Sequence, residues 1–362
     1  MISCSAFQSN GVGLDEKKIE VQTSSGVVSN DLGSLDLGFV SWQDIPFAQP
    51  PVGDLRWRAP RPLDSPSQII SPKDDTACVQ KASVYAGATG EGIVGSEDCL
   101  YLDITAPIDF KDKSYPVMFW IHGGGNTSGL KDYYDYSKLV STRDVVVVRT
   151  NYRLGALGWF THPSIQGEQE GIDKTSNFGT LDIIQSLKWV QTNISGFGGD
   201  PRNVTIFGES AGGHNVFALL ASPMADGLFH KAISQSGYTS SYSLEDAVNE
   251  NGTNRLIERG SSQIIDREFG SGVDRDLLRS ELKEMDARAF IGLYYQEEGI
   301  DSIPLTTRDD IVIPKIGLLE ALSRPEYAKN IPVMAGANKD EVSLWHGLHR
   351  YFIDVSYPLS KL

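Results

Sequence analysis

The stretch from Val204 to Ala221 constrains the fold most strongly, because a strand, a sharp turn and a helix must follow one another there without a linker. Val204-Thr205-Ile206-Phe207 is apolar and prone to form a strand, and the residues from Ala211 into Ala221 have helical periodicity. Gly208-Glu209-Ser210-Ala211-Gly212 joins the two. Small residues two positions before and two positions after Ser210 permit a turn that larger side chains would block.

A serine between a strand and a helix in the pattern G-x-S-x-G is the arrangement of a nucleophile elbow. We therefore predict that Ser210 is a nucleophile and that the helix starting at Ala211 directs backbone N–H groups towards it. A structural glycine-rich turn is the alternative, and the flanking strand and helix argue against it.

A second glycine-rich segment follows another predicted strand. Val117–Ile121 runs into His122-Gly123-Gly124-Gly125, a loop of the kind that supplies N–H donors to an oxyanion. A phosphate-binding loop is excluded, because no Gly-Lys-Ser/Thr follows and no G-x-G-x-x-G is completed. Together the two segments predict a serine ester hydrolase with an α/β-hydrolase fold.

The rest of the chain alternates short β-branched runs with longer helical segments, which indicates an α/β fold with a mostly parallel sheet and helices on both faces. We expect a single domain over residues 1–362, with a helical insertion over 244–298. The prolines of the segment Ile45–Val52 predict an extended surface strap. The expected core strands are Tyr101–Thr105, Val117–Ile121, Val145–Thr150, Val204–Phe207, Lys231–Gln235 and Val333–Ala335.

The net charge of −15 argues against nucleic-acid binding, which needs basic patches. No apolar run has the length of a transmembrane helix, and no secretory leader follows Met1. The opening Met1-Ile2-Ser3-Cys4 fits either the end of a lipoprotein cleavage site or a start codon beside an incidental cysteine. We expect a secreted, periplasmic or cell-surface location and no cofactor.

Cys78 and Cys99 flank a glycine-rich stretch. A bridge between them would stabilise the fold by about 3 kcal/mol in the chain-entropy model and would indicate an oxidising compartment. From the residues alone, two free thiols remain the alternative.

Several long segments resemble the type-B carboxylesterase family, which includes the cholinesterases. They include IPFAQPPVGDLRWRAP, SEDCLYLDI, PVMFWIHGGG, NYRLGALGWF and LKWVQTNISGFGGDPRNVTIFGESAGG, in the order of the family. The resemblance covers nearly the whole chain and implies hydrolysis of small-molecule or lipid esters through an acyl-enzyme. It also implies a role for each matched position: Ser210 as nucleophile; Gly124, Gly125 and Ala211 as the oxyanion hole; Cys78 with Cys99 as a disulfide; and Arg56–Glu97 and Arg153–Asp182 as structural ion pairs.

The third catalytic element of the family is an acid that orients a histidine. Glu341, after the predicted strand Val333–Ala335, takes the position of the acid, and Ser236 matches a buried serine that supports it. The histidine should follow well downstream of Glu341, where the sequence has only His346 and His349 close by. Their i, i+3 spacing could also suggest a metal site, but no third ligand is evident. We therefore expect the chain as written, without the last strand and C-terminal helices of the fold, to be nearly inactive unless a second chain supplies the histidine.

A non-catalytic cholinesterase-like binding or adhesion protein is the alternative function. The stretch between Cys78 and Cys99 contains Tyr85 as its only aromatic residue and no tryptophan, where the cholinesterases place a cation-binding aromatic residue. This composition argues against choline esters and favours a general esterase.

Overall fold

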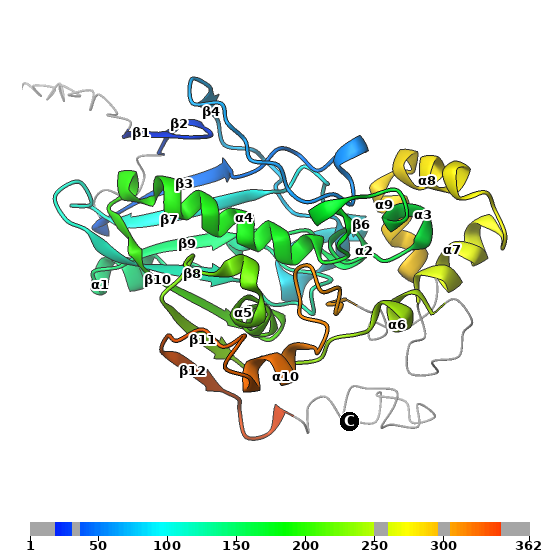
Figure 1. The fold of residues 1–362 in the computed structure, drawn as a ribbon. Coiled ribbons are helices and arrows are strands. Elements are labelled where there is room, and N and C mark those ends of the chain that lie inside the picture. Colours follow the sequence, from blue (N-terminus) through cyan, green and yellow to red (C-terminus); the bar gives the residue numbers. More distant parts are fainter. Residues whose placement is uncertain (1–18, 31–36, 250–259, 296–304, 342–362) are drawn as a thin grey trace, which may run out of the picture.

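The computed structural model describes residues 19–30, 37–249, 260–295 and 305–341 (Figure 1). A seven-stranded sheet forms its centre, in the strand order β12-β11-β10-β8-β9-β7-β3. These strands are β3 (Phe39–Pro46), β7 (Tyr101–Pro107), β8 (Tyr115–Ile121), β9 (Val146–Thr150), β10 (Gly199–Glu209), β11 (Lys231–Gln235) and β12 (Val333–Gly336).

Strands β12, β11, β10, β8 and β9 are mutually parallel, whereas β7 is antiparallel to both of its neighbours, β9 and β3. All six predicted core strands are present, and most of their ends lie within a few residues of the predicted ends. The mostly parallel sheet with packed helices confirms the predicted α/β-hydrolase fold.

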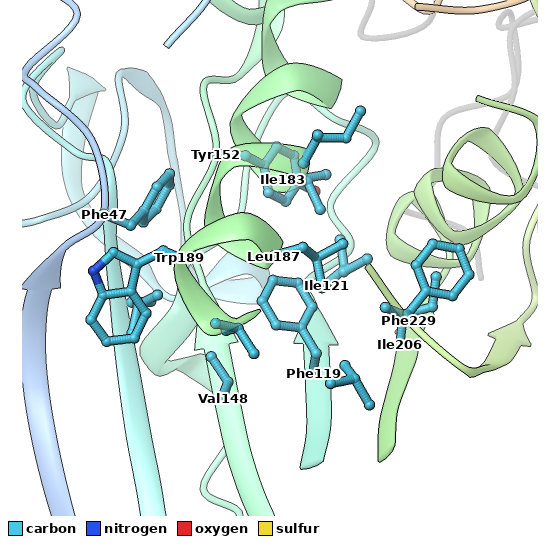
Figure 2. Packing of buried hydrophobic residues seen from close by; sticks show 14 of the residues in the cluster. Phe47, Phe119, Ile121, Val148, Tyr152, Ile183, Leu187, Trp189, Ile206 and Phe229 are labelled. Carbon is cyan, nitrogen blue, oxygen red and sulfur yellow. The ribbon is translucent and has the colours of Figure 1, made fainter. Parts of the chain in front are cut away.

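Helix α4 (Phe178–Asn193) lies across one face of the sheet, beside α5 (Ala211–Ala221). Figure 2 shows Leu187 of α4 beside Phe119 of β8, and Ile183 of the same helix beside Tyr152. All four side chains are almost fully buried. Apolar burial of this kind is the main favourable term for folding, and here it fixes α4 over the strands that carry the site.

The predicted surface strap at Ile45–Val52 is corrected by the structure. Its first residues end the edge strand β3, and the side chains of Ile45 and Phe47 are fully buried. A register shift between Trp42 and Ile45 turns the chain there. Proline has no N–H to donate to a neighbouring strand, so it is tolerated mainly on edge strands. Pro46 fits this rule, because it is the last residue of the edge strand β3. Only the later part, including Val52, is exposed.

The remaining elements surround this centre. Two small sheets precede or flank it: β1 (Glu20–Thr23), β2 (Gly26–Ser29) and β4 (Ile69–Ile70) form one, and β5 (Gln80–Ser83) and β6 (Ala88–Val94) form the other. The other helices are α1 (Ser137–Thr142), α2 (Gly155–Gly158), α3 (Pro163–Gln166), α6 (Leu244–Val248), α7 (Ser261–Phe269), α8 (Arg275–Glu284), α9 (Ala287–Gly292) and α10 (Leu318–Ser323).

Helices α6 to α9 fall within the predicted insertion at 244–298, of which 250–259 and 296–298 lie outside the described residues. Helices α7 to α9 gather at one end of the sheet around a second apolar cluster (Figure 1). In it, Trp57 stacks on Phe160 at 4.7 Å between ring centroids and meets Phe290 of α9 edge-on at 5.0 Å. That this segment is an insertion into the domain stays a prediction.

Three pairs expected from the resemblance are formed. Cys78 and Cys99 make a disulfide. Arg56 binds both carboxylate oxygens of Glu97 at 2.6 and 2.7 Å. Both oxygens of the fully buried Asp182 accept hydrogen bonds from Arg153, at 2.7 and 2.8 Å.

Candidate active site

Ser210 occupies a sharp turn between the end of β10 and the start of α5. Its backbone has φ 56° and ψ −119°, in a region that residues with a side chain rarely adopt. The turn is held on both sides: the Ser210 N–H donates to the Gln235 carbonyl of β11 at 2.8 Å, and the Ser210 carbonyl accepts from the His214 N–H at 2.9 Å. Strain of this kind persists only where the surrounding structure enforces it, and it is common at functional sites.

The two glycines of G-x-S-x-G are required by close backbone contacts. A Cβ added to Gly208 would lie 2.5 Å from the carbonyl carbon of Gly212, and one added to Gly212 would lie 2.1 Å from the carbonyl oxygen of Ile121. These contacts bring the end of β8 against the first turn of α5. The elbow and the loop after β8 are therefore packed together at the carboxyl ends of parallel strands.

The glycine-rich loop after β8 lies directly beside Ser210. A Cβ added to Gly123 would lie 3.3 Å from the Cβ of Ser210. Gly124 and Gly125 both have positive φ, at 95° and 64°, and the Gly124 carbonyl accepts from the Ser128 N–H at 3.0 Å, which closes the turn.

Three backbone donors at this site have no acceptor. Within the described residues, the N–H groups of Gly124, Gly125 and Ala211 take part in no hydrogen bond. These are the donors that the sequence predicts for an oxyanion hole. Ala211 is in addition the first residue of α5, whose dipole favours negative charge at that end. The arrangement can hold an anionic oxygen next to the Ser210 hydroxyl.

Glu341 lies after β12, where the sequence predicts the orienting acid. Its Oε1 accepts hydrogen bonds from the Ser236 hydroxyl and from both the backbone and side-chain nitrogens of Asn338, at 2.8 and 2.9 Å. These donors stabilise the carboxylate, and the Ser236 hydroxyl contributes most to lowering the Glu341 pKa. The serine expected to be buried here is half-buried, while its neighbour Ser234 is buried.

Glu209, which immediately precedes Ser210, adds a second carboxylate that the sequence analysis did not single out. Its pKa is raised by partial burial and by the negative charge of Glu341. Glu209 lines a pocket of about 80 Å³ together with Gly123 and Gly124. The far wall of this pocket carries Tyr133 and Tyr134, whose aromatic rings lie edge-to-face at 4.9 Å.

Glu209 occupies the variable position of G-x-S-x-G, so the motif itself gave no reason to choose it. The segment DYYDY, from Asp132 to Tyr136, was visible as an unusual aromatic run. Its place beside the glycine loop depends on how the chain returns from β8, which no local pattern specifies.

Within the described residues, the rings of the four histidines have their hydrogen-bond partners in groups other than the Ser210 hydroxyl, and Nε2 of His122 has no partner. The His122 ring stacks on Tyr152, and its Nδ1 pairs with the Gly123 carbonyl. Both ring nitrogens of His214 are paired, at 2.8 Å each, with the Tyr238 carbonyl and the Thr306 hydroxyl. Burial lowers the pKa of His122 and of His214 to about 4, so both rings are neutral.

The other two described histidines lie farther from the elbow. His162 caps α3, where its Nδ1 pairs with Ser164. Nδ1 of His230 accepts from the N–H of Val204, the residue that begins the apolar run of β10, at 3.2 Å. His346 and His349 lie outside the described residues. Within the described part of the chain, no histidine ring forms a hydrogen bond with the Ser210 hydroxyl.

A search of the described residues finds no group of three or more histidine, cysteine or carboxylate side chains that could hold a metal ion. In the same ranges, no helix is long and apolar enough to cross a membrane.

Comparisons with known proteins place this chain among esterases in sequence. The model of the Carboxylesterase family matches residues 17–351. Para-nitrobenzyl esterase of Bacillus subtilis (strain 168) is 37% identical over 317 residues, which cover 85% of this chain and 60% of that protein. Fumonisin B1 esterase of Sphingopyxis macrogoltabida is 36% identical over 335 residues, covering 90% of this chain and 57% of that protein.

Solved structures show the same similarity. A thermophilic para-nitrobenzyl esterase superposes with a TM-score of 0.76 at 32% identity, covering 90% of this chain and 64% of that one. A carboxylesterase of Geobacillus stearothermophilus gives a TM-score of 0.75 at 30% identity, covering 94% of this chain and 67% of that one. The chain spans about 60% of the length of these curated relatives. The elbow, the glycine loop and the similarity over nearly the whole chain lead to one conclusion: the chain belongs to the carboxylesterase family.

Proposed function

We propose that this chain carries the nucleophile, the oxyanion hole and the orienting acid of a carboxylic ester hydrolase. The Ser210 Oγ attacks the ester carbonyl and gives up its proton to a base. The carbonyl oxygen becomes an oxyanion that the N–H groups of Gly124, Gly125 and Ala211 stabilise. The alcohol leaves with a proton, and water then cleaves the acyl group from Ser210.

One observation carries this proposal: next to a serine in a strained turn, the residue that follows it and two glycines of the adjoining loop have backbone N–H groups without acceptors. A glycine-rich turn with a purely structural role would use its N–H groups in its own hydrogen bonds, because unpaired backbone donors are costly. Here they are left for a ligand atom. A single donor of this type contributes about 10²–10³-fold to turnover in a serine hydrolase.

Among the described residues, no histidine ring is hydrogen-bonded to the Ser210 hydroxyl as its base. A serine hydroxyl without a base is a poor nucleophile at neutral pH. Loss of the histidine costs roughly 2 × 10⁶ in turnover in the subtilisin case. We therefore propose that this polypeptide alone hydrolyses esters only slowly. Glu341, already held in its ionised form, would orient a histidine supplied by further chain.

Hydrolysis of p-nitrophenyl acetate by this chain, with Ser210→Ala as the control, tests the proposal. We expect weak turnover in the parent chain, a further loss in the variant, and a large gain when a downstream family segment is fused or supplied in trans. Robust turnover by the parent chain would show that it already has a base. His346→Ala and His349→Ala would then reveal whether either ring supplies it.

The second candidate is a non-catalytic binding protein, which is favoured because no histidine ring of the described residues pairs with the Ser210 hydroxyl. Covalent labelling distinguishes the two functions. A fluorophosphonate should modify Ser210 in the extended protein, as detected by mass spectrometry of its peptide. Absence of the adduct in a folded, extended protein would favour the binding protein.

The disulfide supports a secreted, periplasmic or cell-surface location, since such bridges persist in oxidising compartments. A thiol assay on protein isolated from its native compartment checks this. Free Cys78 and Cys99 thiols in that material would argue for a reducing location.

A further inference from the structure

The segment Leu130–Tyr134 forms a thin wall between two cavities. On one side it lines the pocket of about 80 Å³ beside Glu209. On the other side, residues 130–132 line an open cleft of about 620 Å³. Apolar packing supports only part of this wall, where the Tyr134 ring meets the Trp120 ring edge-on at 5.3 Å between centroids. Because there is space on both faces of the rest, polar contacts must fix its position.

An ammonium group among carboxylates holds the middle of the wall. The Lys131 side chain is only 1% exposed, and its Nζ lies 2.9 Å from Asp44, 2.8 Å from Asp103 and 2.9 Å from Asp132. Asp44 belongs to β3 and Asp103 to β7, so Lys131 ties the wall to two strands of the central sheet. The second oxygen of Asp103 binds Arg149 of β9 at 3.1 Å.

Arg149 extends the connection to the end of the wall. Its Nη1 donates to the Tyr134 carbonyl at 2.9 Å. We call Lys131, Asp44, Asp103, Asp132 and Arg149 the Lys131 cluster. Through it, three strands of the sheet fix both the middle of the wall and the backbone of one of its two pocket tyrosines.

Two neutral side chains fix the beginning of the wall. The Gln80 amide makes two hydrogen bonds to Gly129, accepting from its N–H at 2.8 Å and donating to its carbonyl at 2.9 Å. The Lys131 N–H donates to Oδ1 of Asn151 at 2.9 Å. The wall is thus fixed from Gly129 to Tyr134, directly after the loop that carries the oxyanion glycines.

We propose that Lys131 and Asp103 are positioning residues of the ester pocket, which hold the wall so that Tyr133 and Tyr134 face the substrate beside Glu209. The inference rests on the proposed ester-hydrolase function. Buried ion pairs are a poor means of increasing stability, because the charges must lose their water. Their best use is to select one arrangement, and here that arrangement is the shape of the pocket.

The charge balance of the cluster predicts a pH dependence. Three carboxylates face two cations, so one negative charge is in excess when all groups are ionised. Burial raises the pKa of Asp103 to about 7 even though Lys131 and Arg149 lower it. A proton on Asp103 balances the cluster below that pH, and we expect the wall to be held more tightly there than at pH 8.

The other groups near Asp103 come from the elements packed around it. Asp44 is on β3, Lys131 and Asp132 are on the wall, and Arg149 is on β9. The cleft beyond them also contains Lys73, Asp74, Asp75 and Asp135. Asp103→Asn keeps the balanced arrangement at every pH, because two carboxylates then face two cations.

Hydrogen exchange of the whole protein tests the proposal without needing turnover. In Lys131→Met/Asp44→Asn, which removes one cation and one anion together, amides 129–136 should exchange on the order of 100-fold faster. Amides of β9 and β10 should keep their wild-type rates. The matched control is Lys329→Met/Asp226→Asn, which removes an ion pair far from the wall in sequence. Exchange of amides 129–136 should keep its wild-type rate in this control.

Binding of 4-nitroacetanilide, an amide analogue of p-nitrophenyl acetate, gives the functional measurement through quenching of tryptophan fluorescence. The Lys131 double variant should bind it about tenfold more weakly. Wild-type protein should bind it more tightly at pH 6 than at pH 8, and Asp103→Asn should abolish that difference.

Unchanged exchange at 129–136 in the Lys131 double variant would overturn the proposal, as would uniformly faster exchange throughout the protein. A wild-type pH difference retained in Asp103→Asn would also overturn it. If wild-type protein failed to bind the probe while the wall responded as described, the ester-hydrolase proposal would be the one at fault.

Discussion

The Ser236 hydroxyl, at the end of β11, donates a hydrogen bond to Oε1 of Glu341, which follows the neighbouring strand β12. Two adjacent parallel strands thus place a donor and an acid side by side at their carboxyl ends. Because hydrogen bonds to a carboxylate favour its charged form, the pKa of Glu341 is lowered. Glu341 is therefore ionised wherever an ester hydrolase of this type would operate.

Replacing Ser236 should raise the Glu341 pKa. In Ser236→Ala the carboxylate keeps the Asn338 donors but loses its most effective one, so it should take up a proton at higher pH than in wild type. Titration of ¹³C-labelled glutamate carboxyls by NMR measures this. Ser240→Ala, an exposed serine nearby, serves as the control. A Glu341 titration curve identical in Ser236→Ala and wild type would contradict the prediction.

Removing one partner of the largely buried Arg56–Glu97 pair should strongly destabilise the protein. Arg56 is 5% exposed and also donates to the carbonyls of Leu282 and Met285, at 2.8 and 2.7 Å, so it connects the α8 region to the segment after β3. Arg56→Met leaves the Glu97 charge partly buried without its partner, which should lower the free energy of unfolding by about 3–5 kcal/mol.

Urea unfolding at pH 7 measures this loss, with the exposed Arg324–Glu320 pair for comparison. Arg324→Met should change the unfolding free energy far less than Arg56→Met does, because solvent screens an exposed ion pair. Equal effects of the two variants would mean that Arg56 is not acting as a buried connector.

The disulfide should contribute about 3 kcal/mol to the free energy of unfolding, since it closes a loop with a sequence separation of 21. Cys78→Ala/Cys99→Ala should show that loss in urea, whereas Cys4→Ala should not. If reducing agent lowered the stability of the double variant as much as that of the wild type, another thiol would be responsible.

The elbow should be strained by its own side chain. Ser210 has φ 56° and ψ −119°, where glycine has no steric penalty. Ser210→Gly should therefore unfold at a higher urea concentration than Ser210→Ala. Its free energy of unfolding should be greater by about 1–2 kcal/mol, after the greater chain entropy of glycine is subtracted. The two variants lack the same hydroxyl, so their difference isolates the backbone. Equal stability would place the serine outside the strained region in solution.

The sequence was sufficient for β10, Ser210 and α5 because their order and spacing are local. A β-prone run, two glycines and a helical period occupy consecutive positions, and the contacts that require the glycines follow from that geometry. The strand β3 was missed for a local reason too. Its alternate residues Val40 and Trp42 are fully buried, but the prolines from Pro46 onwards are typical of an exposed, extended segment.

The wall of the pocket could not have been predicted in the same way. A lysine between Leu130 and Asp132 in a loop is usually solvated. Lys131 is buried only because carboxylates from β3 and β7 meet it, and those strands lie far apart in the sequence. The partner of a buried charge depends on strand order, and the order of β3, β7 and β9 is set by the whole sheet.

Asp103 should make the stability of the protein depend on pH between about 4 and 7. Its ordinary pKa is 3.8, and burial in the folded state raises it to about 7. In that interval the folded protein holds a proton that the unfolded chain has released, so this contribution to the unfolding free energy falls as pH rises and is lost above pH 7.

Asp103→Asn has no such proton to lose. The stability of Asp103→Asn minus that of wild type should therefore increase from pH 4 to pH 7 and then level off, as measured by urea unfolding at intervals of one pH unit. Asp144→Asn, at an exposed position, should give a difference with no rise over the same interval. A flat difference for Asp103→Asn would mean that Lys131 and Arg149 keep Asp103 ionised throughout, and that the cluster carries its excess negative charge at all these pH values.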